Sequence, residues 1–152
     1  MADYSIPNAW AFTAGLSVTL LLSACSSQPP AHLGVGANGM LAPCPPSPNC
    51  VSSQADEDDA EHLIAPLNAG PDAWESLPLV LSSDAQLRVV VQSETYIHAE
   101  ATSFLFRFVD DLEFLYQPDQ GLVQVRSGSR TGYSDFGVNR TRLEAIRQQL
   151  AE

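Results

Sequence analysis

The alternation of apolar and polar positions in the second half of the chain predicts an antiparallel sheet. From residue 86 onward apolar side chains recur at every second position, and a Pro-Asp-Gln-Gly turn at residues 118–121 interrupts the pattern. A period of two is typical of strands that bury one face. It predicts a meander of four strands, over residues 87–91, 95–101, 105–117 and 122–127.

Two other segments carry apolar residues at helical spacing. The stripes are Trp74, Leu77 and Leu81 in the first segment and Leu143, Ile146 and Leu150 in the second. We expect a helix over residues 71–81, ended or kinked early by Pro78, and a closing helix capped by Asn139. The order of elements predicts an α+β fold, a four-stranded antiparallel meander with the helices packed on one face.

The start of the chain has the pattern of an exported lipoprotein. Residues 9–24 are almost wholly apolar and end in Leu-Ser-Ala before Cys25, which resembles the bacterial lipobox. The stretch is short for a membrane-spanning helix and suits a signal peptide, although residues 1–8 hold no Lys or Arg. We expect a signal peptide over residues 1–24 and a lipid on the Cys25 thiol. An uncleaved anchor and a buried N-terminal helix are the alternatives.

A lipid on Cys25 would place the protein in the cell envelope. Each buried CH₂ of an acyl chain contributes about 0.8 kcal/mol, so several chains hold a protein on a membrane almost permanently. Ser26 rather than an aspartate follows Cys25, as in lipoproteins sorted to the outer membrane. We therefore expect the protein on the periplasmic face of the outer membrane. Residues 25–40 read as the lipidated cysteine and a flexible tether of about 20 Å, and residues 41–152 as a single α+β domain.

The charge balance excludes nucleic acid as a partner. The chain has 7 basic residues, all arginine, against 18 acidic ones, a net charge of −11. Nucleic-acid binding depends on clustered basic side chains, which this chain lacks. The expected partners are therefore the membrane, through Cys25, and a small anionic ligand or an envelope protein.

Two cysteines near the start of the domain are expected to form a disulfide. Cys44 and Cys50 are separated by five residues, three of them proline, and would pair in an oxidising compartment. A short loop of this kind contributes about 2 kcal/mol. A metal site and a redox-active pair are the alternatives, but the spacing is neither that of a zinc site nor Cys-x-x-Cys. We expect no metal and no cofactor.

Strand alternation places one carboxylate, Asp110, on the apolar face between Phe108 and Leu112. A carboxylate in that position is costly unless a cation or several N–H groups satisfy it. The available cations are Arg126, Arg130, Arg140 and Arg142. Asp110 is then either half of a structural ion pair or an acid that serves catalysis or ligand binding.

The opposite face of the predicted sheet is polar and of mixed charge. Its members are Tyr96, His98, Glu100, Arg107, Asp111, Glu113, Gln124 and Arg126. An antiparallel sheet commonly has one wet face, so these groups form either cross-strand ion pairs or a shallow site. Both interpretations assume that helices leave this face uncovered.

The segment over residues 126–140 has the highest concentration of candidate ligand-binding side chains in the chain. Its candidate ligand-binding residues are Arg126, Ser127, Ser129, Arg130, Tyr133, Asp135, Asn139 and Arg140, which join His98, Glu100, Asp110 and Asp111. Hydroxyls, backbone N–H groups and guanidinium groups beside a helix N-terminus recognise carboxylate or phosphate. The alternative is a loop whose own acids occupy its arginines.

Several short motifs resemble the family catalogued as domain of unknown function 1499, whose members occur in bacterial envelopes and plastid lumens. They are Pro43-Cys44-Pro45, Ser47 to Ser53, Ile64-Ala65-Pro66-Leu67, Tyr96 to Glu100, Phe108 to Asp111, Arg126-Ser127, Ser129-Arg130, Gly132 to Asp135, Gly137 and Asn139-Arg140. The resemblance covers residues 41–150. It implies neither an activity nor a cofactor.

Three functions compete on this basis. The first is a lipid-anchored, non-enzymatic binding module. The second is a hydrolase with His98 as base, Asp110 or Asp111 as its orienting acid, and Ser127 or Ser129 as nucleophile. The third is a purely structural envelope protein in which the motifs serve folding.

Overall fold

The computed structural model describes residues 28–68 and 70–151. In chain order the elements are β1 (Cys50–Ser52), β2 (Leu67–Asn68), α1 (Pro71–Ser83), β3 (Leu87–Gln92), β4 (Tyr96–Thr102), β5 (Val109–Gln117), β6 (Leu122–Ser129) and α2 (Val138–Gln149). The strands form one sheet in the order β1-β6-β5-β4-β3, with β2 also paired to β6. The α+β class is confirmed, but the described residues form six strands rather than four.

The predicted meander is the part of the sheet from β3 to β6, in which each strand pairs antiparallel with the next. The two additional strands come from the segment before α1 and pair with the free edge of β6. They are three and two residues long, too short to show an alternation of their own. Periodicity could not reveal them.

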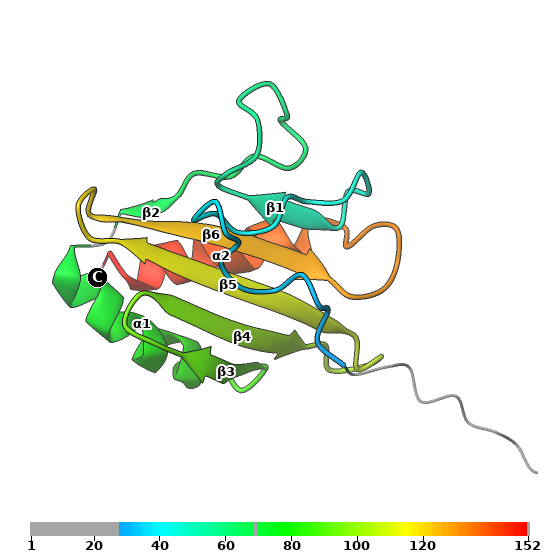
Figure 1. The fold of residues 1–152 in the computed structure, drawn as a ribbon. Helices are drawn as coiled ribbons and strands as arrows, with labels where there is room; N and C mark the ends of the chain where they lie inside the picture. The colour runs from blue at the N-terminus through cyan, green and yellow to red at the C-terminus, as the bar shows by residue number, and fades with distance from the viewer. Residues whose placement is uncertain (1–27, 69, 152) are drawn as a thin grey trace, which may run out of the picture.

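Both helices lie behind the sheet in Figure 1. Leu77 and Leu81 of α1 and Leu143 of α2 have no exposed surface and pack in one core with sheet residues such as Phe114. This burial holds α1 against the sheet, and the helix continues through Pro78 to Ser83 instead of ending early. The buried apolar residues of the described chain all lie between Leu41 and Ile146, so a chain without residues 1–25 keeps this core.

Two details of the predicted strands are wrong. The third strand begins at Val109, not at residue 105, and Phe106 and Phe108 are exposed rather than in the core. Arg107 has a φ of 56°, outside the extended region, so the period of two does not extend through it. In β3 the register shifts between Val89 and Val91, which turns Val91 out of the core.

The start of α2 also differs from the prediction. Gly137, with a φ of 79°, is the N-cap residue, and Asn139 lies in the first turn with its side chain buried. The Asp135 carboxylate accepts hydrogen bonds from the backbone N–H groups of Gly137 and Asn139, both at 2.9 Å. Asp135 therefore satisfies the free N–H groups that the prediction assigned to Asn139.

Residues 28–40 are not an extended tether, because they cross the face of the sheet opposite the helices (Figure 1). The Gly34 N–H donates to Oε1 of Glu113 in β5 at 2.7 Å, and His32 lies beside Arg126 of β6. The polar face is thus free of helices but covered by chain. The predicted signal peptide, Cys25 and residues 26–27 lie outside the described residues. Among the described helices, none has the length and apolar composition to cross a membrane.

Candidate functional site

The polar face of the sheet is a buried charged layer. Strand alternation and register bring together Glu100 of β4, Asp111 and Glu113 of β5, and Arg126 of β6, and each is at most 9% exposed. His98 of β4 lies on the same face and is 3% exposed. The prediction that these residues share a face is confirmed. The expectation of a solvent-exposed surface is wrong, because residues 28–45 lie over it.

One half of the layer is centred on Arg130. Its guanidinium donates to both Asp111 oxygens, at 2.6 and 2.8 Å, and to Glu100 at 2.6 Å. The Nε2 of His98 lies 2.8 Å from Asp111, and Arg88 contacts the second Glu100 oxygen.

Burial and the arginine act in opposite directions on these carboxylates. Burial raises the pKa of Asp111 and of Glu100, but hydrogen bonds and charge from Arg130 outweigh it. Both pKa values therefore lie below their usual range. The two carboxylates in turn raise the pKa of Arg130. Asp111 and Glu100 are thus fixed as anions and are not suited to act as general acids near neutral pH.

The other half of the layer is centred on Glu113, which has no exposed surface. Its Oε1 accepts hydrogen bonds from the Tyr96 hydroxyl at 2.8 Å and from the Gly34 N–H at 2.7 Å. Its Oε2 accepts one from Arg126 at 3.2 Å. Burial and the Glu113 charge raise the pKa of Tyr96, so the phenol stays a donor.

Arg126 is less well satisfied than Arg130. It makes the one long bond to Glu113, and its second terminal nitrogen lies 3.3 Å from Nε2 of His32. Among buried side-chain nitrogen and oxygen atoms of the described residues, only Arg126 Nε has no hydrogen-bond partner. A buried N–H of a cation without an acceptor is costly, and a bound ligand is one way to supply the acceptor.

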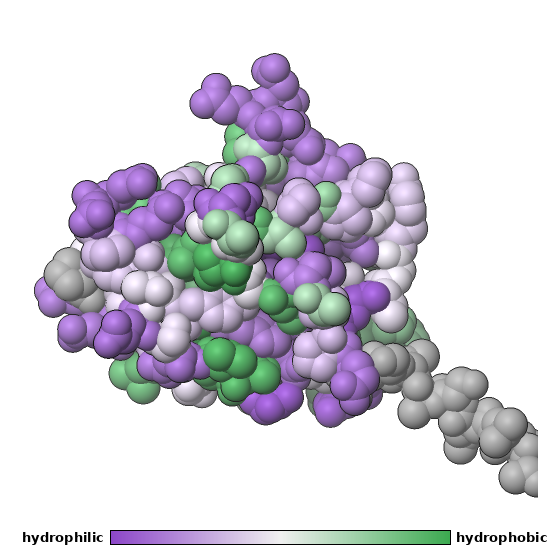
Figure 2. Space-filling model, viewed as in Figure 1, coloured by the Kyte–Doolittle hydropathy of each residue, from purple (hydrophilic) through white to green (hydrophobic). Residues whose placement is uncertain are grey.

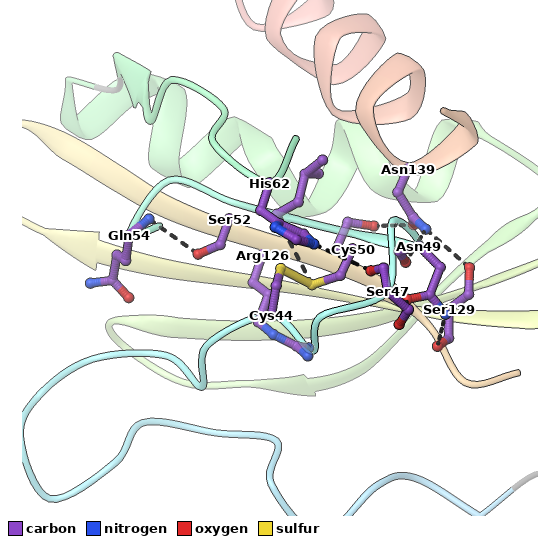
Figure 3. Close-up of a disulfide and its surroundings, with 12 residues drawn as sticks. Cys44, Ser47, Asn49, Cys50, Ser52, Gln54, His62, Arg126, Ser129 and Asn139 are labelled. Atoms are coloured by element: carbon purple, nitrogen blue, oxygen red, sulfur yellow. Dashed lines mark hydrogen bonds between the residues drawn. A yellow bond between two sulfur atoms is a disulfide. The ribbon is translucent and has the colours of Figure 1, made fainter. Parts of the chain in front are cut away.

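A cavity of about 520 Å³ opens where Arg126 lies, between the sheet and the N-terminal segment. Asp111 and Arg126 line it from the sheet and Arg130 from just after β6, while Pro30 and His32 line it from the covering segment. The disulfide from Cys44 to Cys50 of β1 completes the wall. Figure 3 shows the Arg126 side chain beside this disulfide. The volume suits a small ligand.

The disulfide between Cys44 and Cys50 is confirmed. Cys50 pairs with Gly128 in the register of β1 and β6, and a Cβ on Gly128 would lie 3.2 Å from the Cys50 sulfur. The loop between the cysteines is also held by Asn49, which donates to the Gly132 carbonyl at 2.7 Å. His62 lies 3.3 Å from the Ser47 carbonyl (Figure 3).

The serines of β6 face the helices, on the side of the sheet away from His98. The Ser127 hydroxyl donates to Oδ1 of Asn139 in α2, and Asn139 donates to Ser129 at 3.1 Å. The proposed hydrolase arrangement is therefore not formed, because the sheet separates His98 from both hydroxyls. These three polar groups instead join α2 to β6.

Asp110 lies on this helix side, as predicted, and is held by Arg142 of α2 at 2.9 Å. Of the two interpretations of Asp110, the geometry is that of the structural ion pair. Arg140 donates to the carbonyls of Leu63 and Glu61, so it joins α2 to the segment before β2. Tyr133 is 75% exposed in the loop after β6 and takes no part in the cavity.

Five of the predicted site residues thus lie together on the polar side of the sheet, and the others lie elsewhere in the domain. The five are His98, Glu100, Asp111, Arg126 and Arg130. The role of His32 and the segment around it was not predictable from sequence, because a run rich in Gly, Pro and Ser gives no periodic signal. Within the described residues, no group of three or more His, Cys, Asp or Glu side chains is placed to hold a metal ion.

The fold and site define a small α+β domain with helices on one face of its sheet and a covered, charged layer on the other. The chain belongs to the family described as "Protein of unknown function (DUF1499)", whose family model matches residues 40–150. Searches of curated proteins and of solved structures give no significant match.

Proposed function

We propose that the protein is a lipid-anchored component of the cell envelope, on the periplasmic face of the outer membrane. The apolar run that ends in Leu-Ser-Ala before Cys25 supports lipid attachment. The Cys44–Cys50 disulfide supports an oxidising compartment. The test is metabolic labelling with a clickable palmitate analogue in a bacterial host. The native chain should be labelled and fractionate with outer membranes, and Cys25→Ser should lose the label.

The anchored domain is a non-enzymatic binding module, and its ligand is a small molecule with an acidic group. The observation that carries this function is the unpartnered Nε of Arg126 at the wall of the cavity. An oxygen of a carboxylate or phosphate would accept from this N–H and form a charge-assisted hydrogen bond. The buried position protects such a bond from screening by water.

The charges around the cavity favour Arg126 as the anchor point. Asp111 also lines the cavity, but Arg130 already compensates its charge, and Nε2 of His98 lies 2.8 Å from the same carboxylate. Glu113 is shared among Tyr96, Gly34 and Arg126. Of the two arginines that line the cavity, Arg126 is therefore the one with unused hydrogen-bonding capacity, and an anionic group would accept from its free N–H.

The experiment is calorimetric titration of the chain that begins at Ser26 with inorganic phosphate, acetate and succinate as probes. We expect at least one probe to bind the native sequence and Arg126→Gln to abolish that binding. Arg126→Lys keeps the charge without the guanidinium and should weaken binding about tenfold. This second variant keeps the test valid if Arg126→Gln fails to fold.

Arg88→Gln is the matched control. It also removes an arginine from this face, but the Arg88 side chain is 69% exposed and lies outside the cavity lining. Its affinity should equal that of the native chain. If all three probes fail to bind, or if Arg88→Gln weakens binding as much as Arg126→Gln, the charged layer serves folding alone.

A further inference from the structure

The loop between β4 and β5 presents a cluster of large apolar side chains to solvent. Phe104, Leu105, Phe106 and Phe108 are 86%, 73%, 69% and 54% exposed. Single exposed apolar residues are common on protein surfaces, but a contiguous cluster marks a contact with a partner or a membrane. Their burial would remove a large apolar area from water.

A second loop adds apolar side chains at the same end of the sheet. Residues 130–137 connect β6 to α2, and the Arg130 N–H donates to the carbonyl of Val109, where β5 begins. Tyr133 and Phe136 in this loop are 75% and 96% exposed. We name the two loops together, residues 103–108 and 130–137, the apolar end.

Both loops hold a strained backbone. Within the described chain, the non-glycine residues with positive φ are Arg107 at 56° and Phe136 at 55°. A bulky residue rarely adopts this conformation, and such strain is concentrated at functional sites. One strained residue in each loop is a second observation that sets the apolar end apart.

The chain enters the domain at this end. Pro30, one of the first described residues, lines the same cavity as Asp111 of β5 and Arg130, the first residue of the 130–137 loop. Three residues lead from Cys25 to Gln28 and span at most about 11 Å. A bilayer that holds a lipid on Cys25 therefore lies close to the apolar end.

The charge distribution suits a bilayer at this end. Residues 103–108 contain one arginine and no acidic residue, and residues 130–137 contain one arginine and one aspartate, although the chain carries a net charge of −11. Five acidic residues lie instead within residues 54–61. That segment is the loop at the top of Figure 1, which is strongly hydrophilic in Figure 2.

We propose that the apolar end inserts into the lipid surface and fixes the orientation of the domain on its membrane. The proposal rests on the lipid anchor at Cys25 proposed above, because that anchor determines which end of the domain faces the membrane. Phenylalanine and leucine side chains would enter the boundary between headgroups and acyl chains, and Tyr133 would lie at headgroup level. The cavity opening then stays at a fixed distance from the membrane.

The test places a tryptophan on the loop in the mature lipoprotein and reconstitutes it into vesicles of zwitterionic phosphatidylcholine with brominated acyl chains. Phe106→Trp should show quenching by the bromine and a blue-shifted emission. Gln120→Trp is the matched control, because Gln120 is exposed in the turn between β5 and β6, at the other end of these strands from both loops. Its emission should not respond. Equal quenching at both positions, or none at Phe106→Trp, would overturn the proposal.

A second measurement separates this proposal from the anchor itself. The chain that begins at Ser26 carries no Cys25, and its partition onto the same phosphatidylcholine vesicles without bromine is measured by sedimentation. Phe104→Ser together with Phe106→Ser should weaken this partition at least about tenfold while the thermal midpoint stays unchanged. If those substitutions instead abolish a dimer in solution and leave the partition unaltered, the apolar end binds a second copy and the proposal fails. Neither result depends on whether Cys25 is lipidated.

Discussion

The backbone N–H of Gly34 donates to the Glu113 carboxylate at 2.7 Å, across 79 residues of sequence. Glu113 is fully buried, so the N-terminal segment supplies one of the donors that a buried carboxylate requires. The same segment provides His32 beside Arg126 and one wall of the cavity. Residues 28–40 are therefore part of the folded domain and of its cavity, and not only a connection to an anchor.

Removal of this segment should destabilise the domain. A chain that begins at Leu41 leaves Glu113 without the Gly34 donor and exposes part of the charged layer to water. We expect its free energy of unfolding in urea to fall by about 1–3 kcal/mol relative to the chain that begins at Ser26. Identical unfolding curves for the two chains would mean that the segment is a tether after all.

The ion pair on the helix side should contribute to stability as well. Asp110→Ala leaves Arg142 of α2 without its carboxylate partner, and the Asp110 side chain is only 12% exposed. We expect a loss of about 1–3 kcal/mol in the free energy of unfolding. Asp119→Ala, in the exposed turn between β5 and β6, is the control and should change it by less than about 0.5 kcal/mol. Equal effects at the two positions would contradict a specific role for the pair.

The strand pattern identified what depends on period and burial. Alternation predicted β3 to β6 and the shared face of His98, Glu100 and Asp111. Apolar residues at helical spacing predicted both helices. Alternation failed where the backbone leaves regular geometry. Arg107, with a positive φ, turned Phe106 and Phe108 outward, and neither residue type signals such a turn.

The pattern also could not show which chain segments cover a face. The polar face of an antiparallel sheet looks the same in sequence whether water or a glycine-rich segment lies over it, since the strands alternate in both cases. Glu113 and Arg126 are consequently buried in a layer that alternation alone placed at the surface. The hydroxyls of Ser127 and Ser129 face Asn139, a contact between elements that no spacing encodes.

Acid should destabilise the protein through Asp111 and Glu100. Both have folded-state pKa values below the usual carboxyl range because of Arg130, so the folded state holds fewer protons than the unfolded state as the pH falls. The stabilisation is fully present above the unfolded pKa values of about 4 and is lost as the pH falls through the lower folded values. Urea unfolding at pH 7, 5, 4 and 3 should show little change to pH 5 and then a steep decline.

The control for this pH dependence is Arg130→Gln, which removes the group that lowers both pKa values. Its stability at pH 7 should be below that of the native chain, and its further decline between pH 5 and pH 3 should be shallower. An unaltered decline in Arg130→Gln would assign acid sensitivity to other carboxyl groups.

The disulfide requires a glycine at its partner position in β6. A Cβ on Gly128 would lie 3.2 Å from the sulfur of Cys50 and 3.3 Å from its Cβ, tighter than ordinary van der Waals contact. Gly128 is buried beneath the disulfide, so neither strand can move aside freely. We expect Gly128→Ala to lower the free energy of unfolding by about 1–3 kcal/mol, measured in urea under oxidising conditions. In a background with Cys44→Ala and Cys50→Ala the sulfur contact and the cross-link are gone while the Cβ at position 50 remains, so the cost of Gly128→Ala should fall but not vanish. A cost that is the same in both backgrounds would show that the disulfide does not determine the residue at position 128, because only residues in contact are expected to be non-additive.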